Sequence, residues 1–345
     1  MIEEPEAHIH THIQKTLFEN FNFKNTQVFV STHSTQISSV SNISSMSILS
    51  CTDAQTKVYA PSNNLEAGNI ICIERYLDAI RSDILFAKSV ILVEGDAELI
   101  LIPALVKKTL GISLEEMGIS LVKMDGTVFK HISDLFHEDR IRSYCSILTD
   151  LDKAFITHEN ASFADAEYIK AQLNAQKSGA DRKIALDDYT DNNIYVSAFY
   201  AEYTFETELI SYSENVKLFE SVIKTTYKRK ADCEAALANI NSNDMTQKYH
   251  HALKFAKKIG KGWLAAEMVD HITINNIIPE YILKAIKFSL SDRNIEAIAL
   301  KMMEYNVANM PQEKQDEINE CKNFDDKIAV YKALYDDTFI RFWEI

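Results

Sequence analysis

The sequence contains few of the residues that interrupt regular structure. Among its 345 residues are only 8 glycines and 5 prolines, which argues against a linker-rich chain and favours long helices. No apolar run reaches the length of about 18 residues that a membrane-spanning helix needs. The N-terminus lacks the basic and apolar regions of a signal peptide. We therefore expect a cytoplasmic protein without a membrane partner.

Paired cysteines are also missing. The chain has five cysteines, widely spaced and odd in number, and no two of them form a Cys-x-x-Cys pair. This excludes a disulfide framework and a structural zinc site of the usual spacing. The length and the hydrophobic content of 46% are typical of a globular protein with about two domains.

Positive charge is scarce as well, since the formal net charge is −14. This value argues against a simple nucleic-acid binder. Two considerations weaken the objection. Metal-dependent nucleases gather carboxylates at their site, where bound cations reverse the local sign. Phosphate contacts need only a local basic stripe, which Lys254, Lys257, Lys258 and Lys261 provide.

The middle of the chain alternates between strand and helix patterns. Apolar runs predict strands, amphipathic segments between them predict helices, and this order indicates parallel βαβ units. A further helix and strand follow before a mostly helical remainder. The predicted strands are 89–93, 119–124, 143–148 and 194–199, and the predicted helices are 97–110, 128–136 and 161–177. Nearer the N-terminus, the pattern predicts a strand over 26–31 and a helix over 75–86.

Acidic residues follow several of these strands. Glu94 follows the first, and Gly95 is expected to allow a tight turn that leaves its carboxylate in the crevice. Glu98 lies one helical turn later and can point the same way. Asp150 and Asp152 are two residues apart at the end of a strand, so they are expected to share one face.

Oxygen-only ligands of this kind suit Mg²⁺ or Mn²⁺. Two such ions about 4 Å apart can activate water and stabilise the leaving oxygen in phosphodiester cleavage. Asp125 also follows a predicted strand. The alternative is that each acid merely caps a helix or solvates a strand end. That alternative is the better one for any single residue, but the set as a whole favours a metal site.

A family resemblance sharpens this hypothesis. Val90 to Glu98 together with Asp150-Leu-Asp152 resembles the Toprim motif shared by topoisomerases, primases and several nucleases. The resemblance implies a two-metal nuclease centre in which Glu94, Asp150 and Asp152 are catalytic. No separate DNA-gate domain or zinc-bearing primase module can be recognised, which favours a nuclease over those two enzymes.

The N-terminus resembles a different motif. Ile2 to His10 is similar to the Walker B and D-loop segment of ABC-type ATPases, and His33 is similar to their switch histidine. The resemblance implies that Glu3 organises Mg²⁺, that Glu4 polarises water and that His33 senses the γ-phosphate. No Walker A motif occurs in the chain. We therefore expect no ATP hydrolysis by this chain alone, and ATP as a cofactor only if a Walker A half is supplied elsewhere.

An ATPase head followed by Toprim resembles the OLD (overcoming lysogenisation defect) family, which includes the nuclease subunit of Gabija-type antiphage systems. Tyr203 to Glu206 resembles that family's Thr-Leu/Phe-Glu segment and implies Glu206 as a further metal ligand, with Glu208 as a weaker candidate. Lys261 to Ala265 resembles its Lys-Gly-x-x-Ala segment and implies Lys261 as a catalytic lysine. Without the resemblance, Lys261 would be taken as an ordinary solvated lysine.

These observations predict an α/β protein with three parts. A partial ABC-type head is expected over 1–85, a parallel, Rossmann-like Toprim core over 86–212 and a helical region over 213–345. The predicted function is Mg²⁺- or Mn²⁺-dependent DNA endonuclease in antiphage defence or DNA repair. The alternative is a non-catalytic assembly or regulatory subunit of a split ATPase–nuclease complex. The expected partners are DNA, further copies of the chain and a helicase-like or ATPase subunit.

Overall fold

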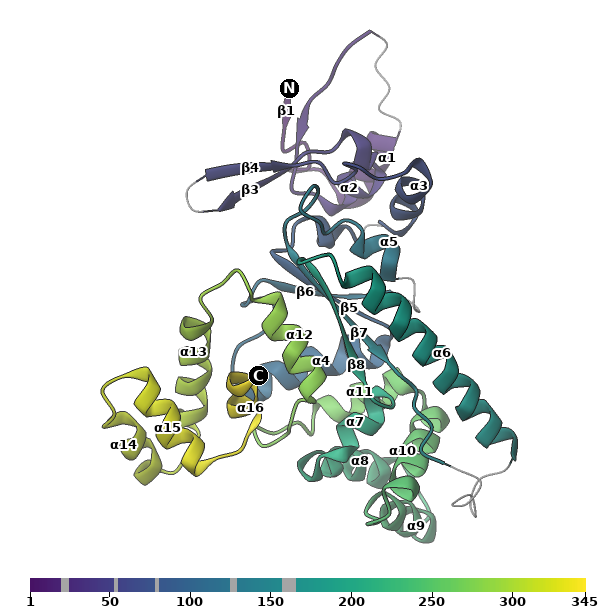
Figure 1. Cartoon of the computed structure of the whole chain (residues 1–345), viewed down its shortest axis with the longest axis vertical. Helices are drawn as coiled ribbons and strands as arrows, with labels where there is room; N and C mark the ends of the chain where they lie inside the picture. Colours follow the sequence, from purple (N-terminus) through teal and green to yellow (C-terminus); the bar gives the residue numbers. More distant parts are fainter. Residues whose placement is uncertain (20–24, 53–54, 78–80, 125–128, 157–165) are drawn as a thin grey trace.

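The computed structural model describes residues 1–19, 25–52, 55–77, 81–124, 129–156 and 166–345. Three regions follow one another in Figure 1: an N-terminal region at the top, a central parallel sheet, and a group of helices below it. The predicted α/β class is confirmed. Asp125, one of the expected site residues, lies outside the described residues.

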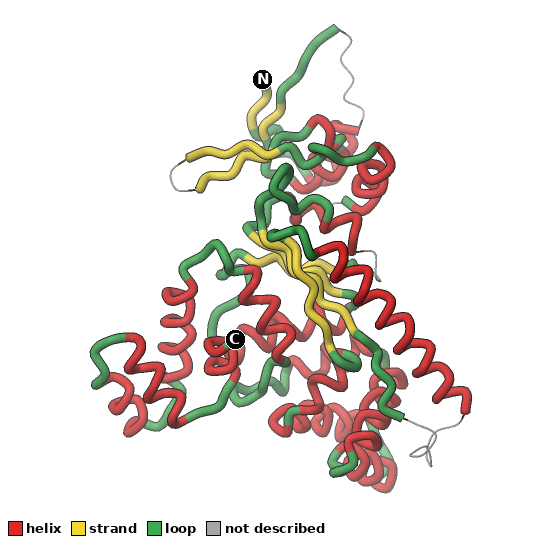
Figure 2. Tube along the Cα trace, viewed as in Figure 1, coloured by secondary structure: helices red, strands yellow, loops and turns green. Residues whose placement is uncertain are grey.

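The central sheet has four parallel strands in the order β6-β5-β7-β8. Every residue of β5 is buried, as a strand covered on both faces requires. Figure 2 shows the strands side by side at the centre, with helices around them. The strands are β5 (Ser89–Val93), β6 (Ile119–Lys123), β7 (Tyr144–Asp150) and β8 (Val196–Ala201).

Separate hydrophobic clusters cover the two faces of this sheet. Along β5, Ile91 and Val93 belong to one cluster, whereas Val90 and Leu92 belong to the other. This alternation follows from the two-residue repeat of a strand. The first face is covered by α4 (Asp96–Leu110), α12 (Glu280–Ser289) and their neighbours, and the second by α3 (Ala67–Tyr76) and α5 (Phe129–Ser133).

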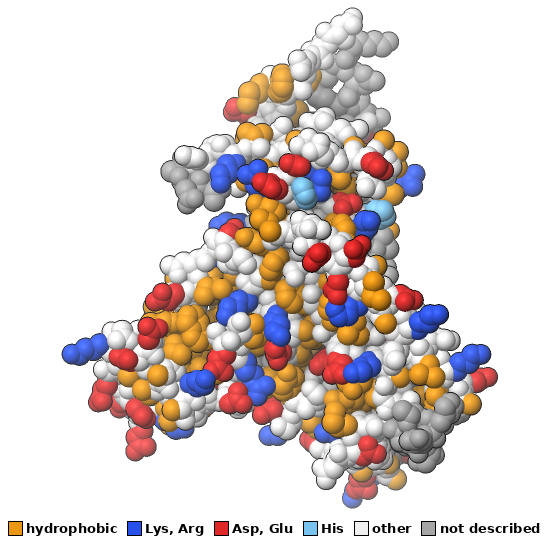
Figure 3. All heavy atoms as spheres, viewed as in Figure 1, with side chains coloured by type: hydrophobic (Ala, Val, Ile, Leu, Met, Phe, Trp, Pro, Cys, Tyr) orange, Lys and Arg blue, Asp and Glu red, His pale blue; other side chains and the backbone are white. Residues whose placement is uncertain are grey.

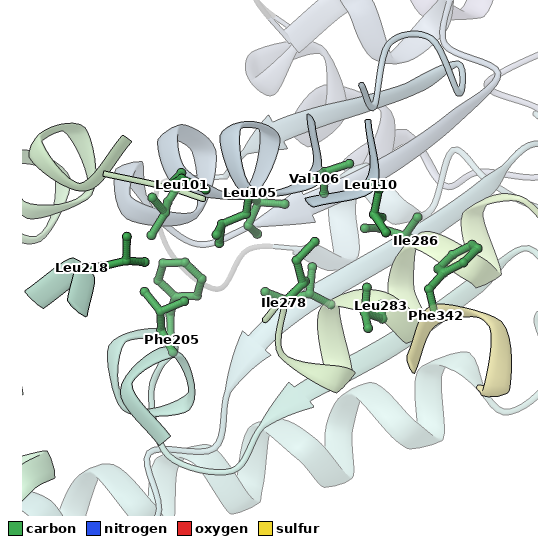
Figure 4. Packing of buried hydrophobic residues seen from close by; sticks show 14 of the residues in the cluster. Leu101, Leu105, Val106, Leu110, Phe205, Leu218, Ile278, Leu283, Ile286 and Phe342 are labelled. Carbon is green, nitrogen blue, oxygen red and sulfur yellow. The ribbon is translucent and has the colours of Figure 1, made fainter. Parts of the chain in front are cut away.

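One hydrophobic core joins the sheet to the C-terminal helices. Leu105 and Leu110 of α4 belong to the same cluster as Leu283 and Ile286 of α12 and Phe342 of α16. Figure 4 shows these side chains between the helices and the strands. The expected boundary at 212–213 therefore separates regions that share a core, although they differ in secondary structure.

The helical region contains ten of the helices described, several of them in the last 75 residues. They are α7 (Phe205–Ser211), α8 (Ser213–Thr226), α9 (Lys230–Ile240), α10 (Met245–Ile259), α11 (Lys261–Val269), α12, α13 (Ile295–Ala308), α14 (Gln312–Asn319), α15 (Phe324–Leu334) and α16 (Thr338–Glu344). No helix within the described ranges is both long and apolar enough to cross a membrane.

The described strands of the N-terminal region form only two-stranded sheets, unlike those of the central sheet. β1 (Ile2–Glu3) and β2 (Val30–Ser31) form a short parallel pair, and an antiparallel hairpin follows. The expected strand over 26–31 is thus only two residues long. The expected helix over 75–86 is wrong, because α3 ends at Tyr76 and a short 3-10 helix covers Arg81–Leu85. The other elements are α1 (Thr11–Glu19), α2 (Thr35–Val40), a 3-10 turn (Ile43–Ser45), β3 (Ile48–Thr52) and β4 (Gln55–Tyr59).

Helix α6 (Ala166–Thr190) differs most from its sequence prediction, which ended it at residue 177. Ser178-Gly179 resembles a helix stop. In the structure, the helix continues because Gly179 is buried against the chain after β7. A Cβ at Gly179 would lie 2.0 Å from the carbonyl oxygen of Leu151. The glycine therefore permits a close contact instead of ending the helix.

Candidate metal centre

The centre of the candidate site is the contact between the ends of β5 and β7. These strands are neighbours, so Glu94 and Asp150 meet at the same edge of the sheet. The Thr149 hydroxyl donates a hydrogen bond to Glu94 Oε1, and the Asp150 backbone N–H approaches the same oxygen at 3.3 Å. One carboxylate is thereby held against the strand that carries the other.

Glu98 extends this cluster from the first turn of α4. Its Oε2 lies so close to Gly95 that a Cβ there would be only 3.3 Å away. The Gly95 backbone is extended, so the glycine provides space for this carboxylate and not the tight turn expected from the sequence. Burial raises the pKa of Glu98 to about 7, and the neighbouring Glu206 and Glu94 contribute to the increase.

Asp150 is a buried acid at the end of β7. Burial raises the pKa of Asp150 well above its ordinary value, and repulsion from Glu94, Glu98 and Glu206 adds to this effect, while Lys261 opposes it. Mutual repulsion shows that the carboxylates are close to one another. Without a bound cation, the raised pKa of Asp150 favours the protonated form of its carboxyl group.

Glu206 enters the cluster from the first turn of α7, and its side chain is only 4% exposed. Its Oε2 accepts hydrogen bonds from the Thr204 hydroxyl and from Lys261 Nζ, each at 3.0 Å. Its Oε1 is buried without a hydrogen-bond partner among the described residues. A buried carboxylate oxygen without a partner is costly, and a cation would satisfy it.

Lys261 is the first residue of α11, and glycines on both sides help to bring it to the site. Gly260 has a φ of +93°, which a residue with a Cβ rarely adopts. A Cβ at Gly262 would lie 3.0 Å from Cβ of Asp96, because the starts of α11 and α4 are packed together. Burial lowers the pKa of Lys261, but Glu206 and the other carboxylates outweigh this and raise it. The ammonium stays charged, and the Lys261 side chain as a whole is 45% exposed.

Asp152 reaches the cluster by another route than expected. β7 ends at Asp150, and Asp152 has a φ of +51°, so the two-residue repeat of a strand does not place both side chains on one face. The Asp152 backbone N–H donates to the Tyr203 carbonyl at 2.8 Å. Its carboxylate faces Arg182 Nη2 at 3.3 Å. The Glu208 carboxylate accepts instead from the Glu202 N–H.

Arg182 of α6 is the residue of this site that sequence reasoning missed. Its Nη2 donates to the Asp150 carbonyl oxygen and lies 3.9 Å from Glu94 Oε1. Its side chain is only 17% exposed. No local motif marks an arginine in the middle of a long helix, so only the packing of α6 against the chain at the end of β7 could identify it.

The donor set is chemically suited to a hard divalent cation. Glu94, Glu98, Asp150, Asp152 and Glu206 supply only oxygen ligands, and the unpartnered Glu206 Oε1 lies among them. Within the described residues, no three acidic, histidine or cysteine side chains already form a compact ligand set. The acids lie near one another but do not point at a common centre. Arg182 is paired with Glu94 and Asp152, and Lys261 is paired with Glu206.

The ATPase-like residues lie in the N-terminal region, at the opposite end of the molecule from α7 and α11 (Figure 1). His33 Nε2 lies 3.6 Å from Glu4 Oε1, and these side chains are 84% and 60% exposed. Glu3 is the last residue of β1 and is exposed. The nearby Glu6 carboxylate accepts from Thr32 Oγ and the His33 N–H, both at 2.7 Å. The structure thus brings Glu4 and His33 together.

Comparisons with known proteins identify one domain of this chain and several similar structures. The family model "Overcoming lysogenization defect protein-like, TOPRIM domain" matches residues 85–152. The C-terminal region of the Burkholderia pseudomallei OLD protein is similar, with 27% identity over 60% of this chain and 98% of that chain and a TM-score of 0.44. The corresponding Xanthomonas campestris pv. campestris region has 24% identity over 65% and 99% of the two chains, with a TM-score of 0.42. No curated protein matches. Residues 85–152 of this chain therefore match an OLD-like Toprim domain.

Proposed function

We propose that this protein is a Mg²⁺- or Mn²⁺-dependent DNA endonuclease whose reaction takes place at the Toprim acid cluster. One observation carries the proposal: the Lys261–Glu206 ion pair lies beside Asp150 and Glu98. These residues come from β7, α4, α7 and α11, which are far apart in the chain. Acids that only cap helices have no need to be buried together, because burying like charges is costly.

The ions would be held by Glu94, Glu98, Asp150, Asp152 and Glu206. When bound, they would supply an activated water and charge stabilisation at the scissile phosphate. Thr149 holds Glu94 in place through its hydroxyl. The Lys261 ammonium donates to Glu206 and has further protons for a phosphate oxygen, where it would offset the charge that develops during cleavage.

The DNA backbone would approach along α10. Lys254, Lys257 and Lys258 are exposed on this helix, and α11 with Lys261 follows after Gly260. The basic stripe is local, since side chains of both signs are interspersed over the face in Figure 3. Because contacts with phosphates release counterions, we expect DNA binding that weakens steeply with salt. Replacing Lys254 and Lys257 together by glutamine should reduce that salt dependence.

Plasmid cleavage tests the proposed activity. Supercoiled DNA incubated with the protein and Mn²⁺ or Mg²⁺ should be nicked or linearised, and Asp150→Asn should abolish this. Glu313→Gln is the matched control, because it removes an exposed acid on α14 with no hydrogen bond or ion pair described. Absence of cleavage by the wild type, or equal cleavage by Asp150→Asn, would refute the proposal.

A second candidate function is a non-catalytic assembly subunit. Its support is the exposed apolar surface of the N-terminal region, where Leu49 and Val58 are paired across the hairpin and Phe29 is also exposed. Calorimetry with Mn²⁺ distinguishes the two functions, because a scaffold has no reason to bind the ion tightly. The same surface agrees with a homodimer or with an ATPase or helicase-like partner.

The resemblance also leads us to propose a cytoplasmic setting in antiphage defence or DNA repair. We further propose that this chain alone does not hydrolyse ATP, because Glu3, Glu4 and His33 have no Walker A segment beside them in the sequence. ATP turnover by the purified chain that is lost in Glu4→Gln would contradict this.

A further inference from the structure

Arg182 makes its contacts through a single terminal nitrogen. Nη2 donates to the main-chain carbonyl of Asp150, lies 3.3 Å from Asp152 Oδ2 and 3.9 Å from Glu94 Oε1. These three oxygens belong to the two strand ends on which the proposed nuclease site is built. A cationic donor among them is bound more strongly than a neutral one.

The position of this nitrogen depends on how closely α6 packs on the chain after β7. Gly179 and Arg182 are three residues apart and therefore lie on the same face of the helix. Any side chain at Gly179 would collide with the Leu151 carbonyl. The glycine brings the helix axis close enough for Arg182 to reach past Leu151 to the acids on either side.

The backbone and the side chain of Asp152 are held separately. The Leu151 and Asp152 N–H groups donate to the carbonyls of Ala201 and Tyr203, at 2.9 and 2.8 Å. These bonds hold the left-handed turn of the chain. For the Asp152 carboxylate, the contact that the structure describes is Arg182. Removing the guanidinium should therefore release the carboxylate while leaving the turn in place.

We propose that Arg182 is a positioning residue of the Toprim site, which aims the Asp152 carboxylate and braces the end of β7 for a divalent cation. The inference rests on the proposed function of this acid cluster. In this role, Arg182 acts through Asp152 and Asp150 and does not itself touch the substrate.

The charge of Arg182 and its positioning role predict opposite effects on cation affinity when the residue is removed. Removing a positive group beside a cation site strengthens cation binding by Coulomb attraction. Loss of a residue that orients a metal-binding side chain weakens cation binding, by about 10- to 100-fold in known metal sites. The sign of the change in affinity therefore separates the two effects.

Calorimetric titration of MnCl₂ into the intact chain is the test. We expect Arg182→Gln to bind Mn²⁺ about 10- to 100-fold more weakly than the wild type. Its half-maximal Mn²⁺ concentration for plasmid cleavage should rise by a similar factor, with a smaller change in the rate at saturating Mn²⁺. Lys177→Gln is the matched control, since it removes an exposed cation from the same helix and should bind Mn²⁺ as the wild type does.

Unchanged or tighter Mn²⁺ binding by folded Arg182→Gln would overturn the inference. If thermal melting shows that this variant is not folded, the same titration on Arg182→Met decides, because methionine keeps the apolar stem and removes the cationic donor: weaker binding supports positioning, and unchanged or tighter binding overturns it. A wild-type chain that binds no Mn²⁺ defeats the proposed function and this inference together. A wild type that binds Mn²⁺ more tightly than Arg182→Gln but cleaves no DNA defeats the nuclease proposal alone.

Discussion

The acid cluster of the Toprim domain and the ATPase-like segment at the N-terminus differ in how their residues are held. Glu206 is almost fully buried and is paired with Lys261 from a helix 55 residues away. Glu4 and His33 are mostly exposed and face each other at 3.6 Å. Exposed pairs contribute little to stability, whereas buried groups depend on every partner around them. Substitutions should therefore act strongly at the first site and weakly at the second.

The largest effect is expected at Lys261. Lys261→Met removes the ammonium from Glu206 and from the approaching phosphate. Plasmid cleavage at saturating Mn²⁺ should fall by about 10²- to 10³-fold, as is typical when a charge-stabilising donor is lost. Lys301→Met is the control, because Lys301 is exposed on α13 and has no hydrogen bond or ion pair described. A loss of less than threefold in Lys261→Met would exclude a catalytic role.

A smaller effect is expected at Asp150, where a substitution should stabilise the metal-free chain. In EDTA, Asp150→Asn removes repulsion with Glu94, Glu98 and Glu206. The metal-free variant should therefore melt about 1–2 °C above the wild type at pH 8, which corresponds to about 1 kcal/mol for a chain of this size. Differential scanning calorimetry measures the change. A lower melting temperature would show that the carboxylates do not destabilise one another.

The pH dependence follows from Glu98. Its pKa is about 7 in the folded chain and 4.5 as the ordinary value, so the folded state binds this proton more tightly. The free energy of unfolding in EDTA should decrease as the pH rises from about 4.5 to about 7, and then level off. Mn²⁺ affinity should rise over pH 6 to 8, because the cation needs the ionised carboxylate. Glu98→Gln should flatten part of both curves, and identical curves would refute this role.

The smallest effect is expected in the N-terminal region. Glu4→Gln removes an exposed carboxylate whose described partner is the exposed His33. Mn²⁺ binding and the melting temperature should stay within the error of the wild type, because exposed pairs contribute about 0–1 kcal/mol. A clear loss of Mn²⁺ affinity in Glu4→Gln would show that the two regions are coupled and would break the comparison.

The strands of the Toprim core were predictable because each is a short, apolar run. The predicted bounds of β5 agree with the structure at both ends. The strand predicted over 143–148 corresponds to β7, which continues as far as Asp150. α6 was not predictable, because Ser178-Gly179 resembles a stop and the contact with Leu151 that preserves the helix is tertiary. The sequence predicts a helical region over 213–345 but not the bounds of its last helices, because helices such as α14 have few buried residues to produce a pattern.

The sequence by itself determined the α/β order of the core, and it placed Glu94 and Asp150 at strand ends, because short-range patterns encode local structure. Resemblance, not spacing, pointed to Glu206 and Lys261. Only the tertiary structure decided that these four residues form one cluster, that Gly95 makes room for Glu98, and that Arg182 holds Asp152. These relations depend on packing between elements far apart in the chain, and no local pattern records which helix face will meet which strand end.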